Sequence, residues 1–311
     1  MSTQQVAARP RPIAGRPVPL ALGDNGVAYL MLLPSVAAFA LFVLFPVVST
    51  FVTAFSEVDT VGRIVRVGSL KNVQALAEDQ YLPQVIRQTV IFVLVTVGLT
   101  ALLSFALALI LNSQFRGREL AKALILIPWA MPYAVAAITW RWIFHGQLGA
   151  LNYLLMLLGV LKTPVVWLSD PTSAFAAAML VEVWSSVPFM TVTFLAGMQA
   201  IPPHIYDAAK MDGAGPWQEF RDMTLPQMRN VIMIVTLLSI IWAFRSFGII
   251  WVLTRGDPVY RTDLVVTYLY KLAFQFNNFG AGFAVAVGLF AVLLLFSIGY
   301  LRLLGGREEA R

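Results

Sequence analysis

Apolar runs of membrane length constrain this chain more than any other feature of its sequence. A helix needs about 20 apolar residues to cross the hydrocarbon core of a bilayer. Six stretches reach that length, at Val27–Thr53, Gln88–Leu111, Leu120–Phe144, Ser173–Met198, Val231–Leu253 and Gly280–Leu304. Every backbone polar group in lipid needs an internal partner, which a helix supplies and an open strand does not. The sequence therefore predicts an all-α integral membrane protein with six transmembrane helices.

Composition supports this class and excludes several others. Hydrophobic residues make up 59% of the chain and charged residues 12%, whereas soluble domains carry about 25% charged residues. The net charge of +6 comes from scattered Arg and Lys, which suits contact with anionic lipid and indicates no nucleic-acid surface. The absence of cysteine excludes disulfides and thiolate metal sites, and two histidines are too few for a histidine metal cluster.

The segments outside the apolar runs predict the domain organisation. Residues 1–26 contain Arg9, Arg11 and Arg16 among prolines and alanines, which indicates a disordered basic tail, and no signal-peptide cleavage pattern follows it. Residues 27–304 form the transmembrane domain and residues 305–311 a short second tail. The outer connections, Phe55–Arg87, Gly146–Thr172 and Arg255–Phe279, are each long enough for a short helix along the membrane surface.

Orientation follows from the basic residues. With the amino terminus inside, twelve basic residues fall on the inner side and ten on the outer side. The clearest local clusters are Arg9, Arg11 and Arg16 before the first span, and Arg116, Arg118 and Lys122 between the second and third. Because loops rich in Lys and Arg stay in the cytoplasm, we expect both termini there, together with the loop between the fourth and fifth spans.

That loop, residues 201–228, is the longest polar interruption in the carboxyl-terminal half. Pro202 and Pro203 end one helix and begin the next, because proline in a first helical turn gives up no hydrogen bond. A short helix through Tyr206–Met211 is expected, broken by Gly213 and Gly215. A second helix would start at Pro216 and close at Leu225-Pro226. The sequence predicts a rigid helical knob on the cytoplasmic surface.

The spacing of Asp207-Ala208-Ala209, Gly213, Met223 and Leu225-Pro226 resembles the cytoplasmic signature of ABC importer permeases. Aspartate stands where that family usually has glutamate, and methionine where isoleucine is usual. The flanks of this signature resemble the carbohydrate branch, as do Gly68–Asn72, Leu126–Pro132 and Trp140–Trp142. The resemblance implies the type I importer arrangement, in which this loop is a coupling helix that docks on the ATPase subunit. The implied coupling residues are Asp207, Ala208, Ala209, Met211, Asp212, Gly213, Ala214, Leu225 and Pro226.

Glu182 lies within the fourth span, where a charge costs about 2.5–3.5 kcal/mol to insert and usually serves a function. One interpretation is a salt bridge with Arg141 or Arg245. The other is substrate contact, because a carboxylate accepts paired hydrogen bonds from sugar hydroxyls while Trp184 or Phe189 offers an apolar face. Resemblance to sugar permeases implies contacts at Glu182, Ser185, Ser186 and Phe189, although maltose permeases carry an amide at the first position.

The fifth and sixth spans add further candidates. Ser239 and Ala243 match substrate-contact positions of sugar permeases, and Arg245 either pairs with Glu182 or holds an oxygen-rich substrate. The small residues of Gly280–Gly288 favour close helix packing, for which the partner permease is the expected surface. Aromatic residues near span ends are expected to be interfacial anchors: Trp129, Tyr133, Trp140, Trp142, Trp251 and Tyr268.

The functional expectation is half of the membrane channel of a bacterial ABC importer for a sugar, in the inner membrane. No GxxxxGK[ST] loop and no catalytic triad is present, so the chain is expected to bind no cofactor and to leave ATP and magnesium to other subunits. The implied partners are a second homologous permease, two ATPase subunits and an extracytoplasmic sugar-binding protein. An ion- or proton-coupled secondary transporter with Glu182 as the proton carrier is the alternative, and the missing nucleophile and metal ligands disfavour an intramembrane enzyme.

Overall fold

The computed structural model describes residues 24–305. The predicted tails at residues 1–26 and 305–311 therefore lie outside the described residues, apart from 24–26 and 305. The chain forms two compact units, Met1–Ser49 and Thr50–Arg311.

The described part of the first unit is helical throughout. It comprises α1 (Asp24–Phe39), the π-helical turn η1 (Ala40–Leu44) and the start of α2 (Phe45–Ala54). The π-helical turn comes just before Pro46, whose missing N–H group interrupts the α-helical hydrogen-bond ladder. This stretch accounts for the first predicted span, Val27–Thr53, and is apolar and long enough to cross a membrane.

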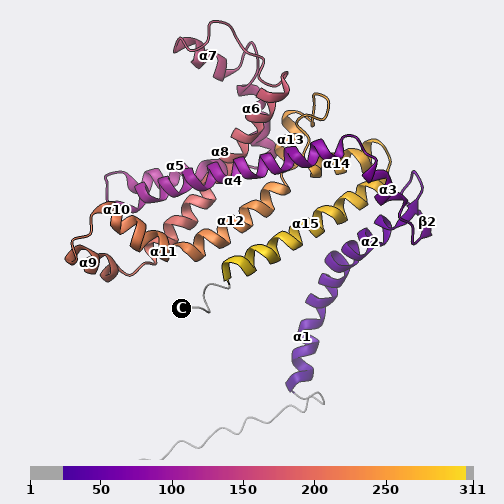
Figure 1. Cartoon of the computed structure of the whole chain (residues 1–311), viewed down its shortest axis with the longest axis horizontal. Helices are drawn as coiled ribbons and strands as arrows, with labels where there is room; N and C mark the ends of the chain where they lie inside the picture. Colours follow the sequence, from indigo (N-terminus) through magenta and orange to yellow (C-terminus); the bar gives the residue numbers. More distant parts are fainter. Residues whose placement is uncertain (1–23, 306–311) are drawn as a thin grey trace, which may run out of the picture. The chain divides into compact units, whose positions relative to one another are not determined.

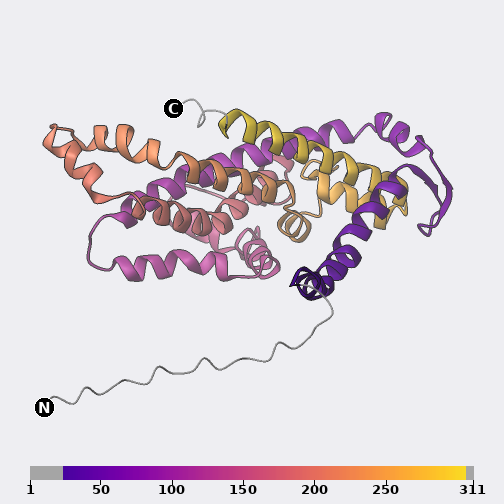
Figure 2. The ribbon, with the colours of Figure 1, turned by 90° about the horizontal axis from the view of Figure 1, so that it is seen from below.

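The second unit is a bundle of long apolar helices. Its members are α4 (Leu82–Asn112), α8 (Pro171–Gln199), α12 (Arg229–Phe244) with α13 (Gly248–Leu253), and α15 (Phe279–Gly305). α4 packs along α8 and also contacts α12, and Figures 1 and 2 show these three helices running alongside one another. Two clusters fill the space between them, one around Phe92 and Val181 and the other around Met190, Phe194 and Met228. The prediction of an all-α membrane protein is confirmed.

The third predicted span, Leu120–Phe144, is two helices rather than one. α5 (Arg118–Ala130) and α6 (Tyr133–Ile143) meet at an angle of 95°. Met131 between them is extended, with φ −80° and ψ 131°, because the ring of the following Pro132 disfavours helical backbone at that position. By length and composition, the described residues contain five helices able to cross a membrane, or six if this bent pair counts as one span.

The outer connections contain the expected short helices and one element that the sequence analysis missed. The helices are α3 (Lys71–Ala77), α7 (Ala150–Leu157) and α14 (Val265–Tyr270), the last continuing as the π-helical η3 (Lys271–Gln275). The missed element is an antiparallel hairpin of β1 (Ser56–Val58) and β2 (Ile64–Val67). Asn72 of α3 holds the start of this hairpin by donating to the carbonyls of Ala54 and Ser56, at 3.0 and 2.8 Å.

The small residues of α15 pack against their own chain. A Cβ atom on Gly280 would overlap the Asn72 side chain, and one on Gly282 would overlap Ala273 of η3. Ala281 and Ala284 are buried as well. The prediction that these residues serve the partner permease is therefore wrong for these four positions, which are used to bring α15 close to α3 and η3.

Candidate functional site

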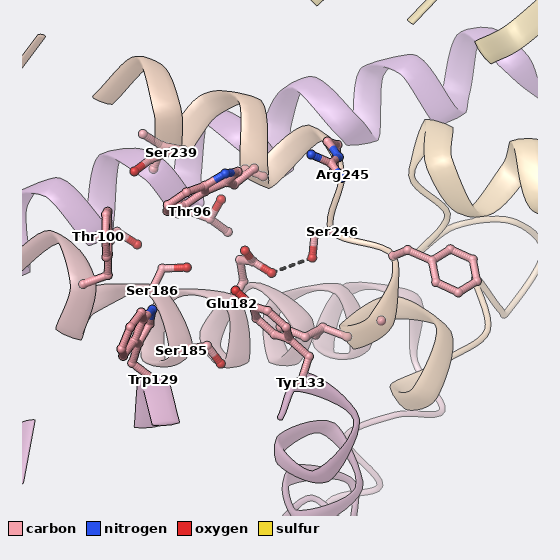
Figure 3. Close-up of a pocket in the computed structure, with 17 residues that line it drawn as sticks. Thr96, Thr100, Trp129, Tyr133, Glu182, Ser185, Ser186, Ser239, Arg245 and Ser246 are labelled. Atoms are coloured by element: carbon pink, nitrogen blue, oxygen red, sulfur yellow. Dashed lines mark hydrogen bonds between the residues drawn. The ribbon is translucent and has the colours of Figure 1, made fainter. Parts of the chain in front are cut away.

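A cavity of about 550 Å³ opens between the spans. α4, α5, α6, α8 and α12 contribute to its wall, as does the three-residue break between α12 and α13 (Figure 3). All seven residues predicted to contact substrate line it: Glu182, Ser185, Ser186, Phe189, Ser239, Ala243 and Arg245. Their convergence from two helices far apart in sequence identifies this cavity as the candidate site.

Glu182 projects from α8 into the cavity. Its Oε2 atom accepts a hydrogen bond of 2.5 Å from the hydroxyl of Ser246, which lies in the break between α12 and α13. Neither arginine considered as a partner lies within salt-bridge distance of this carboxylate among the described residues. Arg141 instead donates to the carbonyl of Val252 at 3.4 Å. The salt-bridge interpretation of Glu182 is wrong in this structure, and the carboxylate faces the cavity.

Hydroxyl groups surround this carboxylate. Ser185 and Thr96 donate to carbonyls one turn earlier in their own helices, at 2.9 and 2.6 Å. These local bonds use the hydroxyl proton and leave the oxygen lone pairs as acceptors. Ser186, one helical turn after Glu182, and Ser239 on α12 add further hydroxyls (Figure 3). The cavity therefore offers many acceptors and few free cations, an arrangement that suits a ligand rich in hydroxyl groups.

Three aromatic side chains from three different helices form one wall of the cavity. The Trp129 ring stacks on Phe189 with centroids 6.3 Å apart, and Phe189 meets Trp242 edge-on at 5.0 Å. Trp129 and Trp242 both line the cavity, and both side chains remain exposed. Trp184 does not line this cavity and instead meets Trp140 edge-on at 5.5 Å. Of the two aromatic residues considered for the apolar face of a ligand, the structure brings only Phe189 to the site.

Several residues of the site were not predicted from the sequence. Trp129 and Tyr133 were expected to be interfacial anchors, yet both line the cavity. Thr96, Thr100, Trp242, Ser246 and Phe247 line it too. One signal was available: Gln88, Thr89, Thr96, Thr100 and Ser104 are all buried and lie along one stripe of α4, which is unusual for a helix that is otherwise apolar.

The polar segment between α8 and α12 forms the predicted knob, which we call the α9 knob. It comprises α9 (Pro203–Met211), α10 (Pro216–Gln218), the π-helical η2 (Glu219–Thr224) and α11 (Leu225–Gln227). The turn after α9 depends on Gly213, whose φ of +82° is unfavourable for other residues. A hydrogen bond of 3.0 Å between the hydroxyls of Tyr206 and Thr224 holds the two halves together. The prediction that Leu225-Pro226 closes the second helix is wrong, because the helical backbone continues through Gln227.

Most of the predicted coupling residues face outward on this knob. Met211 is 87% exposed, the highest value among the large apolar residues described. Exposed positions include Asp207, Ala208, Asp212, Gly213, Leu225 and Pro226, while Ala214 is half-buried. Ala209 is buried and packs inward. The structure therefore brings eight of the nine residues to or near the surface and assigns Ala209 to holding α9 against the rest of the chain.

A bundle of membrane-length helices with a polar, aromatic-lined cavity between them and a rigid polar knob beyond them defines a membrane transport protein. Residues 100–307 match the family of binding-protein-dependent transport system inner membrane components. The chain belongs to that family, and it is therefore a transport component of the inner membrane.

Relatives cover the chain almost end to end. A probable ABC transporter permease of Brucella abortus is 37% identical over 92% of this chain and 99% of its own length. The trehalose/maltose transport system permease MalF of Thermococcus litoralis is 37% identical over 89% of this chain and 92% of its own. The fold matches a chain of a bacterial ABC transporter involved in import of the acidic polysaccharide alginate, with a TM-score of 0.79, 21% identity and coverage of 89% and 94%.

Proposed function

We propose that this chain is one of two permease subunits of an ATP-driven importer that carries a saccharide through the cavity around Glu182. The observation that carries the proposal is the convergence of a carboxylate, several hydroxyls and three aromatic rings at one cavity between the spans. Carboxylates and hydroxyls bond sugar hydroxyls, and aromatic faces cover the apolar faces of a sugar ring. Relatives that carry trehalose, maltose and alginate support the same class of cargo.

The proposed partners are those of a binding-protein-dependent importer. A second homologous permease would complete the channel, two ATPase subunits would bind ATP and magnesium, and an extracytoplasmic binding protein would deliver the saccharide. A solved alginate ABC transporter in complex with a periplasmic protein that holds an alginate pentasaccharide supports the binding-protein part of this proposal. Both termini and the α9 knob would face the cytoplasm, where closure of the ATPases pulls on the knob and switches the cavity between inward-facing and outward-facing states. Such a switch requires the partners to bind the two states differently.

Reconstituted transport tests the cargo assignment. Phe189→Ala removes an aromatic ring from the cavity wall, and Leu180→Ala is the matched control, because it shortens an exposed apolar side chain on the same helix away from the cavity. In proteoliposomes containing the assembled importer, we expect Phe189→Ala to reduce uptake of labelled maltose or another saccharide and Leu180→Ala to leave it unchanged. Equal effects of the two variants would contradict a saccharide path through this cavity.

The energy source is tested separately. If the proposal holds, uptake requires the ATPase subunits, and it requires ATP on the side of the membrane that the knob faces. Glu182→Gln would then alter affinity for the saccharide without introducing or removing dependence on a proton gradient. Uptake by this chain alone that follows a proton gradient and stops in Glu182→Gln would instead support the secondary transporter.

A further inference from the structure

The loop between α6 and α8, residues 144–170, carries a helix whose outward surface is apolar. Four large side chains of α7 and its carboxyl-terminal end are exposed: Tyr153, Leu154, Leu157 and Leu158. At about 100° per residue these positions, with Met156, spread over about 200° of the helix circumference. Between His145 and Lys162 the sequence contains no charged residue. In water, a surface helix would show polar side chains over that arc.

The one amide side chain of α7, Asn152, points inward instead. Asn152 is 2% exposed and uses its whole amide: it donates to the carbonyls of Gly146 and Val165, at 2.7 and 2.8 Å. It also accepts from the backbone N–H of Val165 at 3.2 Å and from the indole N–H of Trp167 at 2.9 Å. Trp167 in turn packs on the core cluster around Phe92 and Val181. The loop is thus closed on itself and anchored, so the orientation of its apolar face is fixed by the fold.

The width and chemistry of this apolar face indicate whether protein or lipid covers it. A protein partner would cover one side of a helix and would match its polar rim with hydrogen bonds, about one per 100–200 Å². The exposed arc of α7 is wider than one side, and among its side chains only the Tyr153 hydroxyl can hydrogen-bond. Lipid requires no such partners and surrounds a helix on every free side.

The neighbouring surface points to the same occupant. Exposed apolar side chains continue from α7 along α6, at Val135, Ile138 and Trp142. Tyr153 and Trp142 are the amphipathic residue types that gather where hydrocarbon meets headgroups, and Lys162, which follows the apolar stretch, suits anionic headgroups. The chain leaves the loop into α8, which is long and apolar enough to cross a membrane, so this apolar surface adjoins a helix that lipid would cover.

We infer that α7 lies within the interfacial layer of the bilayer, with Leu154, Leu157 and Leu158 among the lipid acyl chains. It anchors the end of α8 opposite to the α9 knob. The resulting fixed point lies beside α6, which carries Tyr133 of the cavity wall.

The absence of cysteine from the chain permits a clean test. Leu157→Cys places a reactive thiol at a 70% exposed position, where labelling disturbs no packing, and Val61→Cys is the matched control at a 71% exposed apolar residue of the β-hairpin. Each variant of the full chain is labelled with an environment-sensitive nitrobenzoxadiazole fluorophore. Each is reconstituted in vesicles of phosphatidylcholine and phosphatidylglycerol and then exposed to quenchers in the lipid or in the water.

If α7 is in lipid, the label at position 157 emits at shorter wavelength than the label at position 61. A lipid with a nitroxide near its headgroup then quenches it several-fold more than aqueous iodide does, and position 61 shows the reverse order. Quenching of position 157 by iodide to the same extent as position 61 would overturn the inference. So would loss of lipid quenching when a second permease subunit is added, because α7 would then be covered by protein.

Discussion

The Ser246 hydroxyl fixes the direction of the Glu182 carboxylate, and its loss is the sharpest single-residue test of the cavity. The two oxygens lie 2.5 Å apart, and a hydrogen bond to a charged group is worth about 1.5–3 kcal/mol. Since about 1.4 kcal/mol corresponds to a tenfold change, we expect Ser246→Ala to raise the half-saturating saccharide concentration about tenfold in proteoliposome uptake. Ser246→Thr keeps the hydroxyl and should stay close to wild type, whereas an unchanged value for Ser246→Ala would contradict the positioning role.

A second residue-scale prediction concerns the buried ion pair between Asp263 and Lys271. Their carboxylate and ammonium groups lie 2.7 Å apart with side chains 0% and 5% exposed, and Thr267 donates to the same carboxylate at 2.8 Å. Removing one partner leaves the other charge buried and costs about 3–5 kcal/mol, whereas replacing both by apolar residues is often neutral. Lys271→Met should therefore lower the thermal midpoint in detergent well below that of the double variant Asp263→Leu/Lys271→Met.

The direction in which the pKa of Asp263 is shifted agrees with the expectation that the double variant is the more stable of the two. Burial raises the pKa of this carboxyl above its usual range, although the hydrogen bonds from Lys271 and Thr267 oppose the shift. A raised pKa in the folded state means that the carboxyl contributes most to stability at low pH and that this contribution is lost as the pH rises through the folded pKa. The ion pair at neutral pH is therefore not a large net source of stability, and a double variant that is as unstable as Lys271→Met would contradict this balance.

A charged residue inside an apolar run can be found from the sequence, whereas residues brought to the cavity by a break or bend of the backbone cannot. Glu182 stands out because its insertion is costly, and resemblance to sugar permeases added Ser185, Ser186 and Phe189 on the same helix. Ser246 reaches the site only because the backbone breaks between α12 and α13. Trp129 belongs to the cavity for a similar reason, since the bend after α5 decides which way that end of the helix faces.

At the scale of elements, the turn after α9 depends on one backbone conformation. Gly213 has φ +82°, and a Cβ atom there would meet nothing within 4 Å. Substitution is therefore opposed by backbone strain and not by crowding. A left-handed backbone costs an ordinary residue about 1–2 kcal/mol, while Asn and Asp tolerate it better than β-branched residues do.

We therefore expect Gly213→Val to reduce transport-coupled ATP hydrolysis in the assembled importer and Gly213→Asn to retain most of it. Because a Cβ atom at this position meets no neighbour, the comparison tests mainly the shape of the turn. Equal ATPase activity in the two variants would show that the α9 knob does not need this turn to act on the ATPase.

A proline in a helical sequence does not by itself show whether the helix continues past it or ends. Pro34 and Pro188 lie inside helices that continue past them, whereas Pro132 ends one helix and caps the next. Pro128 lies within the last turn of α5 and Pro132 follows two residues after its end, so each removes a backbone N–H donor close to the bend. That pairing is visible in the sequence, but whether the chain continues or turns depends on packing, in which α13 lies against α6.

At the scale of the whole molecule, the bent pair of helices α5 and α6 decides which side of the membrane each later segment faces. Between Val61 of the hairpin and Met211 of the knob the chain passes through α4, the α5–α6 pair and α8. If the pair crosses the bilayer, three crossings separate the two residues and they face opposite sides. If it enters and leaves by the same side, two crossings remain and both residues face one compartment. Arg116, Arg118 and Lys122 favour the first case, because they hold the start of α5 in the cytoplasm.

Single cysteines distinguish the two cases, since the chain has none of its own. Val61→Cys and Met211→Cys lie at positions 71% and 87% exposed, and Leu94→Cys in the middle of α4 is the buried-in-lipid control. With a membrane-impermeant maleimide on spheroplasts, we expect position 61 to react at once, position 211 to react only after the membrane is opened, and position 94 to react in neither condition. Reaction of positions 61 and 211 from the same side would mean that α5 and α6 do not cross together. An α9 knob on the outer side would then be unable to reach a cytoplasmic ATPase, and the coupling proposal would fail with it.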